Sequence, residues 1–502
     1  MQRHSCKDKI IGVVISFVIK SHRDSSNPFV ISITAQITMS TSGFPVEGSP
    51  QSYWQHEAQQ PEIPSNTGPL PNSCDVAIVG GGYAGIATAY HILKTTSPPR
   101  NVFLLEAKDP CSGATGRNGG HLRPDYLMGA ARNCKKYNAS TAAEIVQFEA
   151  RHLDVIKSLI RSEAIECDFA ETESLAVLTT LEQVSMVREA YEGLKQASSF
   201  SDTLLDVIEF YEGDDVPQRT GLRDAKGYFS TPAARVSPYK LLTSLLARCV
   251  DMGLSLRTQT AVVSVEHAGS DGHTLMMRSG ETMTAQKVVI ATNAYTSAIL
   301  PEYASSIVPC KGLACHIIGP KGKPLPKLLA ASCAIMEQDS VSNKTGYNYM
   351  VQLEDNSIVL GGAHHKYDGN DLGSWYNNVN DTQLIEPARR YFEADYMQRT
   401  FVGWEDSGAC VDRVWTGIMG YSTDSLPHVG EVPGRDGVFI IAGFHGHGMP
   451  VIFLAAEGIA AMTQGLAYEK TGLPSLFKTS RDRLESERND ILAGRGIRST
   501  RD

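Results

Sequence analysis

Short β-branched apolar runs and a helical pattern alternate where the folded part of the chain begins. Residues 74–79 (CDVAIV) form a short, mostly apolar run that is typical of a strand buried in a parallel sheet. A helical pattern follows from Ile86 to about Lys94, and a second apolar run covers residues 101–105 (NVFLL). This order of strand, helix and strand predicts a βαβ unit of an α/β fold.

Strand-like and helical patterns recur later in the chain. Residues 346–352 (GYNYMVQ) and 357–361 (SIVLG) are expected to form strands of a mostly antiparallel sheet. A long apolar helix is expected over residues 450–467, starting at about Met449, with Pro450 in the first helical position, where its missing N–H is not needed.

The composition excludes several classes of protein. Acidic residues outnumber basic ones, 55 to 46, so the net charge of −9 lacks the basic footprint of a nucleic-acid-binding protein. The 10 cysteines are irregularly spaced and fit neither a disulfide scaffold nor a paired CxxC zinc site, so no metal is expected. We find no run of 18 apolar residues and expect no transmembrane span.

The first 72 residues are expected to form an irregular extension, and their beginning is ambiguous. Arg3, Lys7 and Lys9 precede an apolar run from residue 10 to residue 19, as in a secretion signal, but no clean cleavage site follows at once. Met39 is an alternative start codon. A cytoplasmic protein is the expectation, and secretion through residues 1–30 stays open.

A glycine-rich turn joins the first strand to its helix. Gly80, Gly82 and Gly85 supply a G-x-G-x-x-G pattern that includes Tyr83 and Ala84. The first glycine permits a tight turn, the second lets the backbone approach a pyrophosphate, and the third lets the helix pack on the strand. Glu106, at the end of the second strand, would accept hydrogen bonds from ribose hydroxyls. The pattern therefore predicts a dinucleotide site that favours FAD or NAD over NADP.

The segment after Glu106 distinguishes FAD from NAD. Residues 112–121 (SGATGRNGGH) form a loop of small and polar residues in place of further βα repeats. With the preceding turn, this loop resembles the FAD-dependent oxidoreductases of the D-amino-acid oxidase superfamily, above all the γ-glutamylputrescine oxidase-like branch and its fungal relatives. In that family the loop runs along the FAD pyrophosphate and the flavin ring.

Later segments extend the resemblance over about residues 73–470. They are residues 235–238 (RVSP) before a helix at 239–249, residues 260–266 (TAVVSVE), residues 287–294 (KVVIATNA), and residues 415–427 with 437–448 (GVFIIAGFHGHG). The resemblance implies FAD-binding roles for Gly80, Gly82, Tyr83, Ala84, Gly85, Glu106, Ala107, Gly113, Ala114, Thr115, Arg117, Asn118, Gly119, Gly120, His121, Val263, Ala291, Thr292, Asn293, Gly443, His445, Gly446, His447, Gly448 and Met449.

The same resemblance implies an α/β (α+β) architecture with two interleaved domains. A discontinuous Rossmann-like FAD-binding domain would comprise residues 73–160, 225–310 and 410–470. A mostly antiparallel substrate domain would comprise residues 161–224 and 311–409, and residues 471–502 would form a C-terminal tail.

The implied chemistry is oxidation of a C–N bond. A hydride would pass from an amine or amino-acid-derived substrate to flavin N5, and O2 would reoxidise the flavin with release of H2O2. His121, His445 and His447 are the candidates to supply positive charge or a proton near the flavin.

Three departures from the family pattern affect the substrate and the cofactor. Met419 stands where members that oxidise amino acids carry a carboxylate-binding arginine, which makes a small α-amino acid doubtful. Gly417 stands near the position of a flavin-linking cysteine, so FAD is expected to be non-covalent, with Cys111 as the alternative tether. No lysine occurs in residues 357–361, where sarcosine-oxidase-like relatives carry an oxygen-activating lysine.

Two rival functions stay open. One is an FAD-dependent desaturase or oxidative cyclase of a fungal secondary-metabolite pathway, and the other is a non-catalytic flavoprotein. The sequence leaves the substrate, the electron acceptor (O2 or another) and the oligomeric state undetermined.

Overall fold

The computed structural model describes residues 13–21, 31–39, 43–58, 63, 65, 68–200, 202–339, 342–369 and 371–495. The chain divides into two compact units, residues 1–44 and 45–502. In the first unit, strands β1 (Val13–Ser21) and β2 (Ile31–Met39) pair antiparallel. The basic residues Arg3, Lys7 and Lys9 of the signal-like pattern lie outside the described residues. Within the described part, no helix has both the length and the apolar character needed to cross a membrane.

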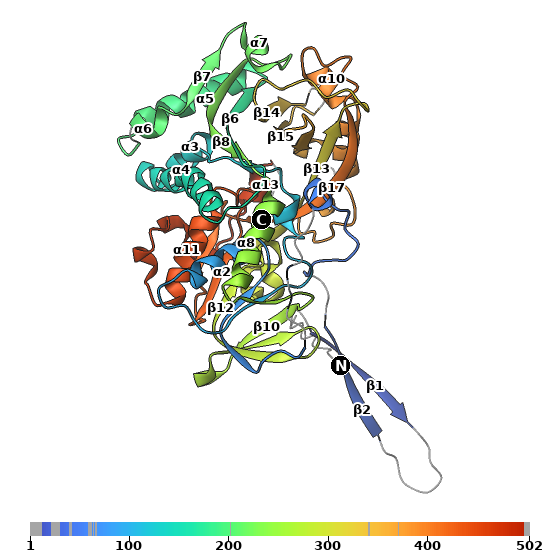
Figure 1. The fold of residues 1–502 in the computed structure, drawn as a ribbon, viewed down its shortest axis with the longest axis vertical. Helices are drawn as coiled ribbons and strands as arrows, with labels where there is room; N and C mark the ends of the chain where they lie inside the picture. The colour runs from blue at the N-terminus through green and yellow to red at the C-terminus, as the bar shows by residue number, and fades with distance from the viewer. Residues whose placement is uncertain are drawn as a thin grey trace, which may run out of the picture. The chain divides into compact units, whose positions relative to one another are not determined.

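The second unit contains an eight-stranded sheet with a parallel centre (Figure 1). The parallel strands are β9 (Ser255–Arg257), β4 (Val102–Leu105), β3 (Ser73–Val79), β12 (Thr282–Ile290) and β19 (Val438–Ala442). Strands β10 (Val262–His267), β11 (His273–Met277) and β18 (His428–Glu431) add antiparallel edges. The predicted βαβ unit is therefore present, because β3 and β4 pair in parallel on either side of a helix in the sequence.

Three mainly apolar helices pack together beside this sheet. They are α2 (Tyr83–Leu93), α8 (Pro238–Asp251) and α11 (Ile452–Thr463), and α2 contacts both of the others. Ile78, Ile86, Leu245 and Ile459 are completely buried in the core that these elements share. Burial of such side chains contributes about 1.5–3 kcal/mol each, so this packing fixes where α2 and α11 begin relative to the strands.

A nine-stranded, mostly antiparallel sheet forms the rest of the frame. Its order is β17 (Cys410–Ser422), β13 (Ile307–Ile318), β16 (Ile358–Gly361), β15 (Thr345–Gln352), β14 (Ser332–Gln338), β6 (Ala170–Leu178), β8 (Gly227–Arg235) and β5 (His121–Leu122), with β7 (Glu209–Glu212) beside β8. Among the described strands, β14 and β6 pair in parallel, and the other neighbours in this sheet are antiparallel. The predicted α/β class with a second, mostly antiparallel sheet is confirmed.

The longer helices outside the parallel-sheet core are α3 (Met128–Lys136), α4 (Ala139–Ser162), α5 (Leu181–Lys195) and α9 (Glu386–Glu393). The shorter ones are α1 (Tyr53–Glu57), α6 (Asp202–Leu205), α7 (Val216–Thr220), α10 (Tyr396–Thr400), α12 (Arg481–Glu485) and α13 (Asp490–Ala493). Two short 3-10 helices, η1 (Ala114–Arg117) and η3 (Asn293–Ala298), lie in the segments predicted to contact FAD.

The structure moves two predicted helix boundaries. Helix α2 begins at Tyr83, three residues earlier than expected, because the glycine turn leads directly into it. Helix α11 begins at Ile452 and ends at Thr463, so the prediction that Pro450 occupies the first helical position is wrong. The carbonyl of Gly448 accepts hydrogen bonds from the N–H groups of Val451 and Ile452, and this turn precedes the helix.

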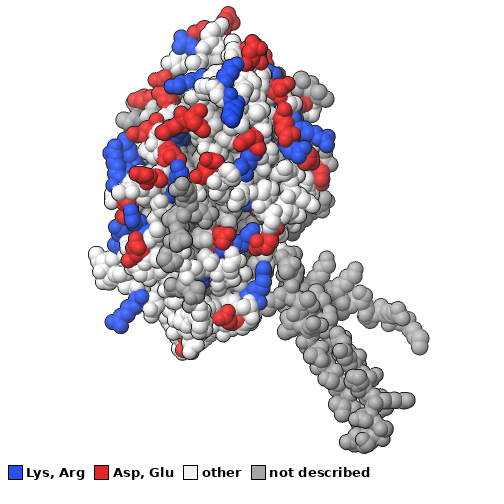
Figure 2. Space-filling view, turned by 45° about the vertical axis from the view of Figure 1, so that its right-hand side comes forward, with Lys and Arg blue, Asp and Glu red and all other residues white. Residues whose placement is uncertain are grey.

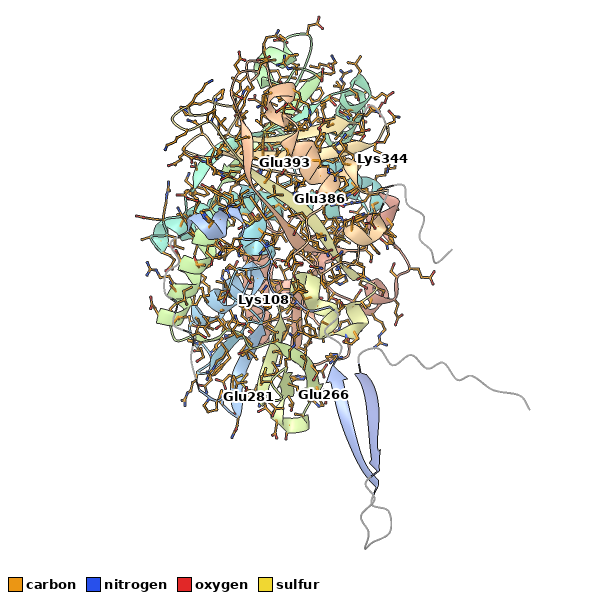
Figure 3. The ribbon with its side chains drawn as sticks, turned by 90° about the vertical axis from the view of Figure 1, so that its right-hand side faces the viewer. Lys108, Glu266, Glu281, Lys344, Glu386 and Glu393 are labelled. Carbon is orange, nitrogen blue, oxygen red and sulfur yellow. The ribbon has the colours of Figure 1, made fainter. Side chains whose placement is uncertain are left out.

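Three strands that lie wholly in segments expected in the FAD-binding domain belong to the antiparallel sheet. They are β5, which falls in residues 73–160, β8, which falls in residues 225–310, and β17, which falls in residues 410–470. In Figure 3, Lys108 in the loop after β4 lies between Glu266 and Glu281 at one end and Glu386 and Glu393 at the other. The loop that follows β4 therefore lies near the middle of the second unit.

Candidate functional site

The predicted dinucleotide residues gather at one edge of the parallel sheet. Strands β4, β3, β12 and β19 are successive parallel neighbours, and their carboxyl ends meet there. The turn at Gly80, the carboxyl group of Glu106, residues 291–293 and residues 443–449 each follow one of these ends. Open α/β sheets bind ligands at this edge.

The glycine turn is packed too closely for any larger residue. Gly80 has φ +110°, and a Cβ atom there would lie 2.7 Å from the carbonyl oxygen of Ala291. A Cβ atom on Gly85 would lie 1.9 Å from the carbonyl oxygen of Gly80. Both glycines are thus required by contacts between the turn, α2 and β12, as the pattern predicted.

The N-terminus of α2 keeps its backbone accessible. Its N-cap is Gly82, which has no side chain to cap the helix, and Gly82 is itself only half-buried. The Tyr83 N–H donates to the Thr115 hydroxyl at 2.9 Å. A helix N-terminus of this kind favours an anionic ligand through its dipole and its N–H groups.

Glu106 is held by backbone donors on both carboxylate oxygens. Oε2 accepts a 2.6 Å hydrogen bond from the Gly81 N–H, and Oε1 accepts one of 2.8 Å from the Lys108 N–H. Burial raises the pKa of Glu106, while these donors act in the opposite direction. Each oxygen retains a lone pair, so the oriented carboxylate can accept further bonds from a diol.

The segment around Val263 lies beside Glu106. The Thr260 N–H donates to the Glu106 carbonyl at 2.8 Å. The β10–β11 ladder is irregular between Val262 and Ser264, and Val263 falls in this irregularity. The backbone groups of Val263 are therefore placed outside the regular ladder, where a ligand can use them.

Arg117 has an internal role in the loop after Glu106. Its side chain is 5% exposed, and its guanidinium donates to the carbonyls of Ser112, Pro50 and Thr416 at 2.8–2.9 Å. The buried Asp381 carboxylate lies 3.9 Å away as a counter-ion. Arg117 thus fixes the shape of the loop that also contains Ala107, Gly113, Ala114 and Thr115, and its charge is already compensated.

Asn118 connects this loop to the segment before α11. Its Nδ2 donates to the carbonyl of Thr115 at 2.9 Å and lies 3.8 Å from the Met449 sulfur, and its Oδ1 accepts from the Gly120 N–H. Trp54 donates from Nε1 to the Asn118 carbonyl at 2.7 Å. A Cβ atom on Gly120 would lie 2.7 Å from the Trp54 ring, and one on Gly119 would lie 2.5 Å from the Tyr349 ring. Both glycines are therefore needed for this packing.

Asn293 joins the ends of β12 and β19. Its Oδ1 accepts from the Gly443 N–H at 3.0 Å, and its backbone has φ +45°. A Cβ atom on Gly420 would lie 2.4 Å from the same Oδ1. Ala291, Thr292 and Asn293 are thereby held against the glycine-rich segment that carries Gly446 and Gly448.

Cys111 is a buried structural thiol. It lies 3.8 Å from the Gly81 carbonyl oxygen, and burial raises the pKa of the thiol. A thiol with a raised pKa forms little thiolate, so it is a poor nucleophile toward a flavin.

The three predicted histidines have different surroundings. His121 Nδ1 lies 3.1 Å from the Ser332 hydroxyl, and its buried Nε2 has no hydrogen-bond partner among the described residues. Burial, aided by the charge of Arg123, lowers the pKa of His121 to about 3. His121 is therefore neutral at physiological pH.

His445 is neutral as well. Its ring stacks on Tyr421 with centroids 4.3 Å apart, and its Nδ1 hydrogen-bonds to the Ser422 carbonyl at 3.0 Å. Burial, followed by the charge of Arg132, lowers the pKa of His445 to about 4. Its backbone is in the left-handed region, with φ +53°.

His447 differs because it contacts a carboxylate. Its Nε2 lies 2.8 Å from Oε2 of Glu149, a buried residue of α4. Burial opposes the charged imidazole, but the charge and hydrogen bond of Glu149 outweigh it and raise the pKa of His447. The three histidines thus divide into two neutral rings and one ring whose protonated form is favoured by a carboxylate.

Met419, an apolar residue, lies beside the glycine-rich segment. Met419 lies on β17, and a Cβ atom on Gly446 would lie 3.5 Å from its sulfur and 3.1 Å from the Tyr421 hydroxyl. Lys311, on the neighbouring strand β13, is buried and donates from Nζ to the carbonyls of Asn380 and Gln383. Burial lowers the pKa of Lys311, and its ammonium group points to these carbonyls.

The arrangement fits FAD in three respects. The glycine turn leaves space for no side chain, the N-cap Gly82 of the helix beside it supplies no capping side chain, and the Glu106 carboxylate is oriented at the next strand end. The unpartnered Nε2 of His121 adds a buried polar atom in the loop that the resemblance assigns to the flavin. This donor and acceptor set suits a diphosphate with an adjacent ribose diol.

Sequence reasoning missed three residues that shape the site. Trp54 fell within a segment expected to be irregular, Glu149 lies in an ordinary amphipathic helix, and Asp381 lies in a loop. A serine N-cap with glutamine at the third helical position, Ser52 and Gln55, was the one local signal of order around Trp54. The partners of Glu149 and Asp381 are distant in sequence, and no local pattern identifies them.

On the face drawn in Figure 2, the described acidic and basic side chains are interspersed, without segregation by sign.

Comparison with known proteins agrees with this geometry. The model of a family described as "FAD dependent oxidoreductase" matches residues 75–462. The gamma-glutamylputrescine oxidoreductase of Escherichia coli is 24% identical over 399 residues, which cover 78% of this chain and 84% of that protein. A probable oxidoreductase, OrdL, of Haemophilus influenzae is 21% identical over 410 residues, covering 80% of this chain and 87% of that protein.

A solved structure shares the fold. The crystal structure of glycine oxidase from Geobacillus kaustophilus has a TM-score of 0.64 at 20% identity, covering 82% of this chain and 99% of that chain. The fold described above thus recurs in a protein of low sequence identity.

Proposed function

This chain belongs to the family of FAD-dependent oxidoreductases, and we propose that it oxidises a C–N bond of an amine or amino-acid-derived substrate. FAD is the cofactor of this family, and the chemistry that it supplies when bound is acceptance of a hydride at N5 from the carbon that bears the nitrogen. Such a reaction requires a neutral amine and close alignment more than a strong base.

We assign the FAD site to the residues at the carboxyl edge of the parallel sheet. The diphosphate would contact the turn from Gly80 to Gly85 and the N-terminus of α2, and the ribose would contact Glu106. Val263, the loop from Ala107 to His121, residues 291–293 and residues 443–449 complete the proposed site. The discontinuous segments 73–160, 225–310 and 410–470 would supply these residues, while their strands β5, β8 and β17 belong to the antiparallel sheet.

Met419 is the observation that carries the substrate class. Its thioether lies beside Gly446, and the family resemblance implies a carboxylate-binding arginine at this position in members that oxidise amino acids. An uncompensated carboxylate beside an apolar thioether pays a desolvation cost, so a simple amine is favoured over a small α-amino acid. The similarity to a gamma-glutamylputrescine oxidoreductase supports an amine substrate.

The protein's own residues position the reactants and limit charge. Arg117 and Trp415 fix the loop from the inside, since the Trp415 Nε1 donates to the Arg117 carbonyl at 2.9 Å. The neutral imidazoles of His121 and His445 can hydrogen-bond without repelling an ammonium group, and the Glu149 carboxylate favours the protonated form of His447.

The direct test is an anaerobic titration of the purified holoenzyme with a panel of primary and secondary amines and α-amino acids. Bleaching of the flavin absorbance by amines but not by glycine or alanine is the expected result. Bleaching by small α-amino acids alone would contradict the proposed substrate class, and the absence of flavin from the protein would contradict the proposed site.

O2 is the proposed electron acceptor, with H2O2 as its product. Admitting air to the reduced enzyme should restore the flavin absorbance with one H2O2 per substrate oxidised. The alternative, a desaturase or oxidative cyclase of secondary metabolism, would give a product two hydrogens lighter that keeps its nitrogen. Methionine in place of a carboxylate-binding arginine at position 419 is compatible with that alternative. Mass analysis of the product distinguishes the two enzymes. The relatives reported above are bacterial, so a fungal pathway has no support from them.

A further inference from the structure

Glu149 of α4 and His447 of the glycine-rich segment form a close contact that favours a protonated imidazole. Strand β16, by contrast, contains no lysine. We propose that Glu149 is a positioning residue that holds His447 as an imidazolium cation, and that the imidazolium itself is the positive group beside the flavin, where β16 offers no lysine. The inference rests on the proposed FAD site.

The geometry of Glu149 is that of a fixed, buried anion. Its side chain is 7% exposed, and Oε2 accepts both the Asp125 N–H at 2.8 Å and the His447 ring nitrogen at 2.8 Å. A buried carboxylate is strongly destabilising unless it is paired and hydrogen-bonded. Its position on α4 alone therefore does not account for a charged group at this buried site. Glu149 therefore has an electrostatic partner, and that partner is His447.

His447 lies where its charge can reach a ligand. It belongs to the segment between β19 and α11, and its side chain is 40% exposed although its Nε2 contacts a buried carboxylate. One face of the ring is thus anchored in the protein while the rest borders open space. His445, two residues earlier, turns instead to a backbone carbonyl and to Tyr421.

The other charged groups around His447 leave the imidazolium favoured. Asp125, in the loop after β5, adds a second carboxylate, and Arg123 of the same loop opposes it. His152, one turn further along α4, is locked as a neutral ring, because its Nε2 accepts the Leu454 N–H and its Nδ1 bonds to the Phe148 carbonyl. Burial lowers the pKa of His152 to about 3, so it adds no competing charge.

A fixed cation beside the flavin would have a thermodynamic effect. Reduced flavin carries negative charge, and a fixed positive charge in a site with little water stabilises it more strongly than a solvated one does. The flavin reduction potential should therefore be higher while His447 is protonated. It should fall more steeply with pH as His447 loses its proton.

The first experiment measures the charge of His447 without substrate. Histidine side chains labelled with 13C would be titrated by NMR in the wild-type holoenzyme, Glu149→Gln and Glu144→Gln, with His447→Asn to assign the resonance. Glu144 is the matched control, because it lies on the same helix but its carboxylate contacts Ser475. The expected result is a His447 pKa above 6.5 in the wild type and in Glu144→Gln, and below 6.5 in Glu149→Gln. An unchanged His447 pKa in Glu149→Gln would overturn the proposal.

The second experiment measures the flavin reduction potential against pH in the same proteins. Wild type and Glu144→Gln should show a bend at the NMR pKa of His447, which His447→Asn lacks and Glu149→Gln shifts to lower pH. A His447 pKa that moves while the potential curves coincide would show that the pair lies too far from the flavin, and would overturn the proposal. Because neither experiment uses substrate, the result is independent of whether the amine panel succeeds.

A further variant separates charge from folding. Glu149→Asp keeps the negative charge on a shorter side chain, so it should restore much of the raised His447 pKa. If Glu149→Gln fails to fold, the comparison of Glu149→Asp with wild type and Glu144→Gln decides instead. If the pair only stabilised the fold, its removal would lower the unfolding temperature without moving the bend in the curve of reduction potential against pH.

Discussion

Replacing Gly85 by alanine tests the packing of the dinucleotide turn, because helix propensity and steric overlap predict opposite changes in stability. Gly85 lies in the first turn of α2, where alanine is intrinsically favoured over glycine by up to about 1 kcal/mol. A Cβ atom there would lie 1.9 Å from the Gly80 carbonyl oxygen and 3.3 Å from the Ile78 side chain. The oxygen belongs to the backbone of the turn and cannot rotate away as a side-chain tip could.

The steric effect should dominate. Normal contact requires that the helix and the turn separate by about 1 Å, and overpacking of this kind typically costs about 1–3 kcal/mol. The net loss of stability is then about 1–2 kcal/mol. The turn that moves is the proposed diphosphate cradle, so FAD affinity should fall about 10-fold or more, at about 1.4 kcal/mol per factor of ten.

The assay is a pair of measurements with a matched control. Urea unfolding of the apoprotein gives the stability, and flavin fluorescence titration gives the dissociation constant of FAD. Gly193→Ala is the control, because Gly193 lies in the exposed part of α5 and a Cβ atom there has no heavy atom within 4 Å. This control should be as stable as wild type or slightly more stable, with unchanged FAD affinity. A Gly85→Ala protein that matches the control in both measurements would refute the reasoning.

Three further experiments test other parts of the site and the fold. Met419→Arg should confer turnover of small α-amino acids and reduce that of simple amines, measured as the ratio of kcat/KM values; an unchanged ratio would show that position 419 does not contact the substrate. Acid precipitation should leave FAD in the supernatant, since burial raises the pKa of the Cys111 thiol and leaves little thiolate to link, whereas a yellow pellet would indicate a covalent flavin. Asp424→Asn should cost about 2 kcal/mol at pH 7, because the ion pair with Arg483 outweighs burial and lowers the pKa of Asp424 from 3.8 to about 2. That stabilisation is fully present above pH 4 and disappears as the pH falls toward 2, so wild type and variant should approach equal stability in acid unfolding curves; a constant difference would contradict the assignment.

The sequence was sufficient for features that depend on local pattern. The strand at residues 74–79, the glycine turn after it and the strand at 346–352 were all predicted, because burial period and glycine spacing are properties of neighbouring residues. Sheet membership is different, since β8 and β17 have the same kind of apolar pattern as strands of the parallel sheet. Their partners, β6 and β13, lie elsewhere in the chain, and local periodicity does not encode which edge a strand joins.

The three histidines differ in their tertiary surroundings, which the local sequence does not encode. All three stand beside glycines in predicted flavin loops, so no local pattern ranks them. The structure separates them by partner, because His121 bonds to a hydroxyl, His445 to a carbonyl, and His447 to a buried carboxylate. A hydroxyl or a carbonyl does not offset the desolvation of a buried imidazolium, whereas a carboxylate does. Only the third ring is therefore favoured as a cation. The carboxylate that favours this cation belongs to Glu149, which lies 298 residues away from His447 in the sequence and carries no motif of its own.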